Sequence, residues 1–421
     1  MREAIEPLVR NGMAHQLVAS LEATLRYDQH KPLPVGVPLK LTDRAGSAVR
    51  ALAEAYHRLI TRIVDLHAKD TRIRKILATP RALTDDLRRS EDVADPQVHL
   101  MRIDFLPRID GSLTIIETNA NCPGGLLFAG ITSRAWRDVL EDQHKASLRV
   151  NPLENEDWLF DWLREAAGQR CMSTVGLFRT DGGNRLELDE YAGVLRRHGI
   201  DVFEASPRDV SFDGRTATAH GRQFEVGYQK VGMQDFLQMR PHLDDYITSV
   251  LSGALFVPNG QRSRWVGDNK LCLAVLSDPD YADLFEPADY ESVRDAIPWS
   301  RNLAMCSDAM LSVISRDRQR YVVKHPLDTR GRGVFIGLDA ASRGEWEATI
   351  ARGAQDNWLV QEYVATPTLP TAWTLGGHPG IHHDLAVVVA QGTVAGARAR
   401  SSRDSKVNVA GTGRFHPVFL P

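Results

Sequence analysis

The stretch from Met101 to Gly125, MRIDFLPRIDGSLTIIETNANCPGG, limits what this chain can fold into more than any other part of it. Residues 98–106 and 113–119 are rich in Ile, Leu, Phe and Thr, as expected for β-strands. Asp110-Gly111 between them is the dipeptide that two-residue hairpin turns favour, because both central residues adopt positive φ. The stretch therefore predicts an antiparallel hairpin, with imperfect pairing near Pro107, which lacks an N–H to donate.

The predicted turn fixes which residues lie opposite each other. Asp104 then faces Glu117 and Arg102 faces Asn119, with all four side chains on one face because strand side chains alternate. Two opposed carboxylates repel each other, and Mg²⁺, which prefers a few oxygen ligands plus substrate phosphates, would remove that repulsion. The oxygens of Asp104, Glu117 and Asn119 therefore form a candidate Mg²⁺ site. The alternative is a solvated polar strand face on which Arg102 neutralises one acid.

Size and composition leave most function classes open but exclude a few. With 421 residues the chain is long enough for two or three domains, and its 25% charged and 43% hydrophobic residues are ordinary for a globular protein. A net charge of −3 gives no electrostatic reason to expect nucleic acid or an anionic membrane as a partner. No apolar run is long enough to span a bilayer, and the N-terminus lacks a signal-peptide core. The four cysteines form no CxxC pair, so we expect a cytoplasmic protein without a disulfide framework or zinc site.

The order of predicted elements indicates a mixed α/β and α+β chain. Apolar residues recur every three or four positions after Thr42 and Asp43, either of which could cap the helix. From Ser173 the pattern becomes strand, helix, strand, which predicts a parallel sheet with a ligand crevice at its strand ends. We expect four regions: a helical segment at 1–95, the hairpin and a following helix at 96–150, a βαβ domain at 151–262, and a second mixed region at 263–421.

The last region contains several polar residues next to apolar strands. Lys324 ends one strand and precedes the loop LDTRGRG, where glycines let backbone N–H groups approach phosphates and the ammonium neutralises charge. The P-loop pattern GxxxxGK[ST] is absent, and glycines also make ordinary hairpin turns. Lys270 lies at a predicted helix start, where lysines are usually exposed. Arg398 and Arg400 share a strand face and could hold a phosphate or carboxylate, although exposed strand arginines are common.

These motifs, taken in order, resemble the ATP-grasp ligases, in the circularly permuted branch that includes glutathionylspermidine synthase and eukaryotic-type glutathione synthetase. The resemblance covers roughly residues 98–415 and rests on RIDF with ETNANCPGG, then DNKLCLAVL, VVKHPLDTRGRGVFIG, WLVQEYV and GARARSS…NVAGTG. The R-x-D…E-x-N pairing is its most specific part. It implies a permuted ATP-grasp fold, with the βαβ domain on the substrate side and 96–150 belonging to the ATP-grasp core.

The resemblance also implies roles for single residues. Asp104, Glu117 and Asn119 correspond to ligands of catalytic Mg²⁺, and Arg102 and Arg400 to catalytic arginines. The implied ATP-binding residues are Lys270 and Lys324 for the phosphates, Asp328, Gly331 and Gly333 in the covering loop, and Gln361, Glu362 and Val364 in the strand that reads adenine.

Two departures from the family pattern stand out. His325 separates Lys324 from Pro326, where Lys-Pro is expected, and no carboxylate after QEYV is placed for the ribose hydroxyls. The first ninety or so residues match no motif of the family.

The implied reaction is carboxylate–amine ligation through an acyl phosphate, with release of ADP and phosphate. Small-molecule substrates, amino acids in particular, are expected, and a γ-glutamyl dipeptide synthesis is one form of this. Arg179 or Arg185 could pair with an amino-acid carboxylate, although a turn at Asp181–Gly183 explains that loop equally. The alternatives are an ATP-dependent phosphotransferase, a peptide- or polyamine-modifying ligase of the same fold, or an ATP-binding scaffold. A homodimer is the base-rate expectation for assembly.

Overall fold

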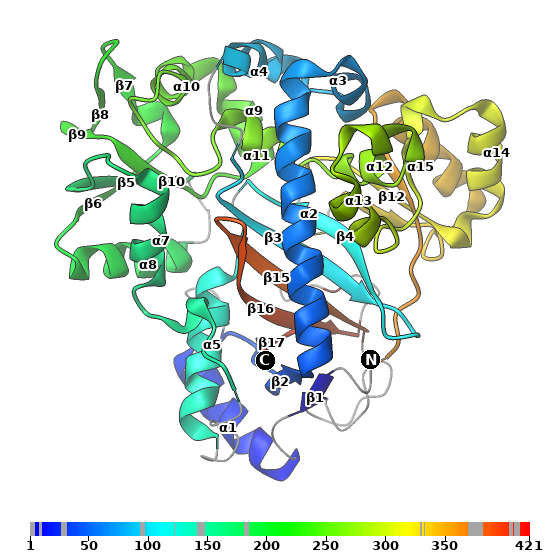
Figure 1. Ribbon diagram of the computed structural model, residues 1–421, viewed down its shortest axis with the longest axis horizontal. Coiled ribbons are helices and arrows are strands. Elements are labelled where there is room, and N and C mark those ends of the chain that lie inside the picture. Colours follow the sequence, from blue (N-terminus) through cyan, green and yellow to red (C-terminus); the bar gives the residue numbers. More distant parts are fainter. Residues whose placement is uncertain are drawn as a thin grey trace.

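A seven-stranded sheet built from strands within residues 5–119 and 382–419 forms the centre of the computed structural model (Figure 1). The structure describes residues 5–7, 11–26, 32–92, 97–121, 123–140, 148–180, 185–328, 331, 333–368, 382–403, 407 and 413–421. Neighbouring strands are antiparallel except β17 and β2, which run parallel. In spatial order the strands are β1 (Ile5–Pro7), β2 (Leu39–Leu41), β17 (Arg414–Phe419), β16 (Thr393–Ser402), β15 (His382–Ala390), β3 (Leu100–Pro107) and β4 (Leu113–Asn119).

The predicted hairpin is β3–β4, and its pairing of polar residues is confirmed. Asp104 pairs with Glu117, and Arg102 pairs with Asn119. The two-residue turn, however, is wrong. Arg108 N–H donates to the Ser112 carbonyl at 2.8 Å, and Gly111 takes the left-handed conformation at φ 89° in a three-residue loop. A one-residue shift in register follows Asp104, and it compensates for the longer turn by leaving Ile116 without a partner on β3.

Both faces of the central sheet are covered. The long helix α2 (Asp43–Lys69) crosses one face, and its N-cap is Thr42, whose hydroxyl accepts from Ala45 N–H. Strand β15 alternates between two cores, as expected for a strand buried on both faces: Leu385, Val387 and Val389 pack on the α2 side, and Val388 and Ala390 pack on the other. Other helices on the α2 side include α3 (Thr71–Leu77), α12 (Cys272–Leu276) and α13 (Pro287–Arg294), and those opposite include α5 (Leu126–Val139) and α7 (Trp158–Ala167).

The N-terminal segment is only partly helical, contrary to expectation. Strands β1 and β2 join the central sheet, because residues 39–41 alternate in burial and pair with both β1 and β17. The helices of this segment besides α2 and α3 are α1 (Asn11–Thr24) and α4 (Thr84–Arg89).

The predicted strand–helix–strand unit is confirmed as a three-stranded parallel sheet in the order β10-β5-β6. It lies on one side of the central sheet in Figure 1, and a small antiparallel sheet of three strands adjoins it. The elements of this region are β5 (Thr174–Phe178), α8 (Arg185–Arg197), β6 (Asp201–Ala205), β7 (Ser211–Phe212), β8 (Ala217–Ala219), β9 (Arg222–Phe224), β10 (Val226–Gln229), α9 (Met233–Met239) and α10 (Asp244–Leu251).

A four-stranded antiparallel sheet on the opposite side carries the predicted nucleotide strands, in the order β11-β14-β12-β13. Helix α11 (Gln261–Gly267), which is entirely buried, leads from the βαβ region into this part of the chain. The remaining elements are β11 (Ser300–Asn302), α14 (Asp308–Arg316), β12 (Tyr321–Lys324), β13 (Val334–Ile336), α15 (Arg343–Gln355) and β14 (Leu359–Glu362).

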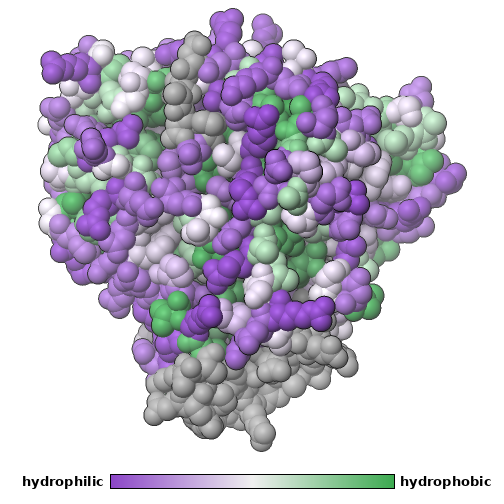
Figure 2. Space-filling view, viewed as in Figure 1, coloured by the Kyte–Doolittle hydropathy of each residue, from purple (hydrophilic) through white to green (hydrophobic). Residues whose placement is uncertain are grey.

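The face drawn in Figure 2 is dominated by polar side chains, with apolar residues scattered in small groups. Among the described residues, no helix combines the length and the apolar character needed to cross a bilayer.

Candidate active site

The carboxylate of Asp104 lies between two guanidiniums. Arg102 on the same strand donates from Nε at 2.6 Å and from a terminal nitrogen at 2.9 Å, and Arg400 on β16 donates at 3.1 Å. Arg400 is held in turn by Asp384, its partner across β15–β16. Burial by itself raises the pKa of Asp104, but Arg102 and Arg400 outweigh burial and hold that pKa well below its usual range. Asp104 is therefore an ionised counter-charge that fixes both arginines.

Arg398 adds positive charge to this cluster without a carboxylate of its own. Its guanidinium stacks 4.9 Å from the Phe415 ring centre, and its Nε has no hydrogen-bond partner within the described part of the chain although the residue is 4% exposed. Burial, together with repulsion from Arg102 and Arg400, lowers the pKa of Arg398 to about 9. A buried cation with an unused donor is suited to hold an anionic group of a ligand.

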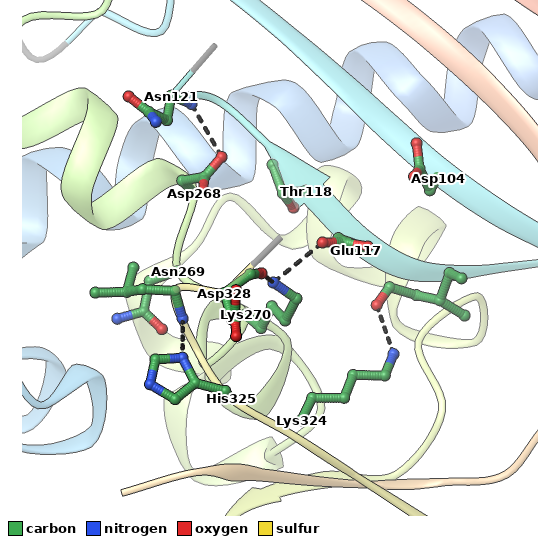
Figure 3. Close-up of polar contacts among 12 residues, drawn as sticks. Asp104, Glu117, Thr118, Asn121, Asp268, Asn269, Lys270, Lys324, His325 and Asp328 are labelled. Carbon is green, nitrogen blue, oxygen red and sulfur yellow. Dashed lines mark hydrogen bonds and ion pairs between the residues drawn. The ribbon is translucent and has the colours of Figure 1, made fainter. Parts of the chain in front are cut away.

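Two lysines contact β4, the edge strand of the hairpin (Figure 3). Lys270, in the connection between α11 and α12, lies 3.0 Å from a Glu117 oxygen and donates to the Asp328 carbonyl at 2.7 Å. Lys324, at the end of β12, donates to the Ile116 carbonyl at 2.8 Å. Ile116 is the β4 residue that the register shift leaves without a partner on β3. The irregularity in the hairpin therefore gives Lys324 its acceptor.

Burial makes the Lys324 ammonium easier to deprotonate. The side chain lies among apolar strands, and this desolvation lowers its pKa to about 8 even though Glu117 raises it. Its second acceptor is the amide oxygen of Gln361, at 2.7 Å, and Gln361 in turn donates to Ser300.

The segment expected to read adenine contains strand β14, but the Gln361 side chain of this strand contacts other protein groups. The Gln361 amide faces Lys324 and Ser300 on the neighbouring strands, and the residue is only 2% exposed. Glu362 is half-buried near Arg320, and Val364 is half-buried just beyond the strand end. The adenine-reading role of β14 stays a prediction, and it falls on Glu362 and Val364 rather than on the Gln361 side chain.

The predicted covering loop is only partly within the described residues, since 329, 330 and 332 lie outside them. Gly331 has φ 70°, a conformation that glycine adopts readily. A side chain at Gly333 would come within 2.6 Å of His325 and 2.9 Å of Asp328, so glycine is needed there for close packing.

Glu117 and Asn119 fit the role of Mg²⁺ ligands better than Asp104 does. The Glu117 side chain is 24% exposed, and among the described residues its ion-pair partner is Lys270. The buried Asn119 Nδ2 has no partner among the described residues, so no bond from that nitrogen fixes the amide, and its oxygen is the atom that would ligate Mg²⁺. Both Asp104 oxygens already accept from arginines, and no group of three or more His, Cys, Asp or Glu side chains gathers anywhere in the described chain. The ligand role of Asp104 therefore stays a prediction, and the geometry favours it as a holder of arginines.

Several polar residues that hold the site together escaped sequence reasoning. Asp268 accepts from Ala120 N–H at 2.6 Å and from Asn121 N–H at 2.9 Å, directly after the hairpin. The one feature of the sequence that pointed to Asp268 was its position two residues before Lys270. Asp384 had a clearer signal, since it is an acid directly before the apolar run Leu385–Ala390 of its strand.

The segment after Asn121 is held from the βαβ side. Glu187 and Lys230 form a buried ion pair at 2.7 Å. Glu187 accepts from Gly125 N–H at 3.0 Å, and Lys230 donates to the Pro123 carbonyl at 3.0 Å. Nothing in the sequence pairs these two residues. Arg179, considered above for a substrate carboxylate, is instead paired with Glu204 at 2.7 Å, and the Arg185 side chain and residues 181–184 lie outside the described part.

A solved structure resembles this chain over nearly its whole length. It is a glutathione synthetase-like effector from Globodera pallida in its apo form, with a TM-score of 0.61 and 14% identity, and the match covers 97% of this chain and 96% of that one. The chain has a glutathione synthetase-like fold. Neither family models nor curated proteins match the sequence. The structural likeness confirms the mixed α/β fold and the resemblance to this group, while the circular permutation and the domain limits stay predictions.

Proposed function

We propose that this protein is an ATP-dependent ligase that joins a carboxylate to an amine, with Mg²⁺ as the metal. One observation carries the proposal: Lys270 and Lys324, from separate segments, converge on Ile116–Glu117 of the hairpin, and an arginine cluster lies on the neighbouring strands. Cations arranged around one strand edge are suited to the triphosphate of ATP. Phosphoryl transfer depends mainly on such positioning and charge neutralisation.

Each group at the site has a role in the proposed reaction. Lys270 and Lys324 would hold the phosphates, and Arg102 and Arg400 would stabilise the charge on the phosphoryl group in transfer. Glu117 and Asn119 would hold Mg²⁺, which neutralises phosphate charge when bound. The substrate carboxylate attacks the γ-phosphorus and forms an acyl phosphate while ADP leaves. The amine then attacks the acyl carbon, phosphate leaves, and an amide remains.

The arginine cluster favours an acidic substrate. Arg398 carries a donor that no described group uses, so a carboxylate of the acid substrate could pair with it. We propose amino acids as the substrates, with a γ-glutamyl dipeptide synthesis as one form of the reaction. Small molecules are thus the proposed partners, and a homodimer stays the expectation for assembly.

Product analysis by mass spectrometry tests the proposal. The purified protein is incubated with Mg²⁺-ATP and pooled amino acids, dipeptides and polyamines, and phosphate release is followed in parallel. A ligase gives a new mass equal to two pool members minus water, together with ADP and phosphate. Phosphorylated product without free phosphate would instead identify a phosphotransferase.

Two lysine variants make the assay specific. Lys270→Met should abolish product, whereas Lys69→Met, which removes an exposed lysine on α2, should leave the rate unchanged. Equal rates in Lys270→Met and the wild type would contradict the proposed site.

A further inference from the structure

His325 departs from the expected Lys-Pro sequence, and it holds two parts of the chain next to the candidate site. Its ring Nδ1 accepts from Leu327 N–H at 3.2 Å, and its backbone N–H donates to the Gly333 carbonyl at 2.7 Å. The half-buried ring packs edge-on against Trp358, with 5.5 Å between ring centres. The residue thereby ties the turn that follows β12 to the start of β13.

The turn held in this way is the one that contacts Lys270 (Figure 3). The backbone N–H of Lys270 donates to the Pro326 carbonyl at 3.1 Å, and its ammonium donates to the Asp328 carbonyl at 2.7 Å. Leu327, whose N–H is held by His325, lies between these two acceptors in sequence. A change in the conformation of Leu327 would therefore move both groups that hold Lys270 against Glu117.

We propose that His325 is a positioning residue for the nucleotide phosphates: by accepting from Leu327 N–H, it keeps the turn Pro326–Asp328 in the conformation that holds Lys270 in place. The inference rests on the proposed function, since it assumes that Lys270 contacts ATP. The bond needs an unprotonated Nδ1. Burial lowers the pKa of His325, as do Lys270 and Arg352, while Asp328 and Asp356 raise it, and the net lowering favours the neutral ring.

Two substitutions separate the hydrogen bond from the packing of the ring. In His325→Asn, the side-chain oxygen can accept from the N–H two residues later, as asparagine does in Asx-turns. His325→Leu keeps an apolar group against Trp358 but removes the acceptor. The probes are Mg²⁺-ATP and its non-hydrolysable imido analogue, with Kd measured by calorimetry at pH 7.5 and urea unfolding measured on the same samples.

We expect His325→Leu to weaken the affinity for both nucleotides about five- to tenfold, the size of one lost hydrogen bond, and His325→Asn to stay within about twofold of the wild type. Equal affinity in His325→Leu and the wild type would overturn the inference. So would a His325→Asn variant that binds as weakly as His325→Leu while its urea unfolding is normal. If His325→Leu unfolds early, His325→Ala removes the same acceptor with a smaller side chain and is judged by the same criterion. Failure of the wild type to bind either nucleotide would instead refute the proposed function.

Discussion

Lys324 combines burial with a charge that the proposed reaction requires. Its ammonium has two neutral acceptors, the Ile116 carbonyl and the Gln361 amide, and forms no ion pair with a carboxylate among the described residues. Such a group loses its proton more easily than a free lysine, because the charged form is the one that burial penalises. An ATP phosphate placed beside it would oppose this effect by favouring the charged form.

The lowered pKa of Lys324 predicts how stability changes with pH. The folded state releases the Lys324 proton near pH 8, whereas the unfolded state keeps it up to about pH 10.5. Between these values the unfolded state binds more protons, so this residue makes the unfolding free energy rise with pH. Relative to Lys324→Met, the wild type should gain about 1 kcal/mol per pH unit in that window. Urea unfolding at pH 7.5, 8.5 and 9.5 measures this gain, and a constant difference between the two proteins would contradict it.

Asp104 predicts a large effect from a small change. In Asp104→Asn, the buried guanidiniums of Arg102 and Arg400 lose a shared negative charge, which should cost about 3–5 kcal/mol of unfolding free energy. The matched control is Asp289→Asn, whose partner Arg58 is 56% exposed and whose loss should cost less than about 1 kcal/mol. Similar losses in the two variants would mean that the arginine cluster is not held by Asp104.

At the scale of elements, two helix-interior glycines have opposite expected effects. A Cβ at Gly130 in α5 would lie 2.0 Å from the Leu153 carbonyl oxygen, whereas a Cβ at Gly193 in α8 meets nothing within 4 Å. Gly193→Ala should stabilise the protein by about 0.5–1 kcal/mol through helix propensity. Gly130→Ala should destabilise it by about 1–3 kcal/mol, because the helix must move away. Thermal unfolding of both variants checks the difference in sign, and a shift in the same direction would disprove the packing of α5.

An element was predictable from the sequence where its structure depends on residues close together in the chain, and not where it depends on contacts with distant segments. The strands of the hairpin were predictable from local residues, but the pairing of Asp104 with Glu117 was predicted from a two-residue turn that the structure does not have. The pairing holds because the one-residue shift in register offsets the longer loop. The irregularity at Ile116 was not predictable, because the same local residues allow a shorter turn with regular pairing. The acceptor that this irregularity provides is used by Lys324, which lies far away in sequence. The contacts of Asp268 depend likewise on where α11 packs.

At the scale of the whole molecule, the segment from Asn259 to Asp268 connects the hairpin to the segment that carries Lys270. Asn259 accepts from Leu100 N–H at 3.1 Å and donates to the Leu100 and Ala120 carbonyls, both at 2.5 Å. Asp268, at the other end of α11, accepts from Ala120 N–H. The strand ends and the segment that carries Lys270 are therefore held in one arrangement.

A substitution at Asn259 measures how much this connection contributes to the free energy of unfolding. Its φ of 56° suits glycine, so Asn259→Gly keeps the backbone conformation and removes only the side-chain hydrogen bonds. The variant should lose about 2–4 kcal/mol of unfolding free energy, because buried groups on Leu100 and Ala120 lose their partner. Asn357→Gly is the matched control, since Asn357 has φ 58° and a single long contact, 3.4 Å, with Asn302. It should change stability by less than about 0.5 kcal/mol.

Nucleotide affinity decides whether the connection also serves the site. If the connection sets the position of Lys270, Asn259→Gly should bind Mg²⁺-ATP more weakly than Asn357→Gly at a temperature where both are folded. Equal affinities with unequal stabilities would mean that Asn259 holds the sheet to α11 but does not determine where the lysine lies.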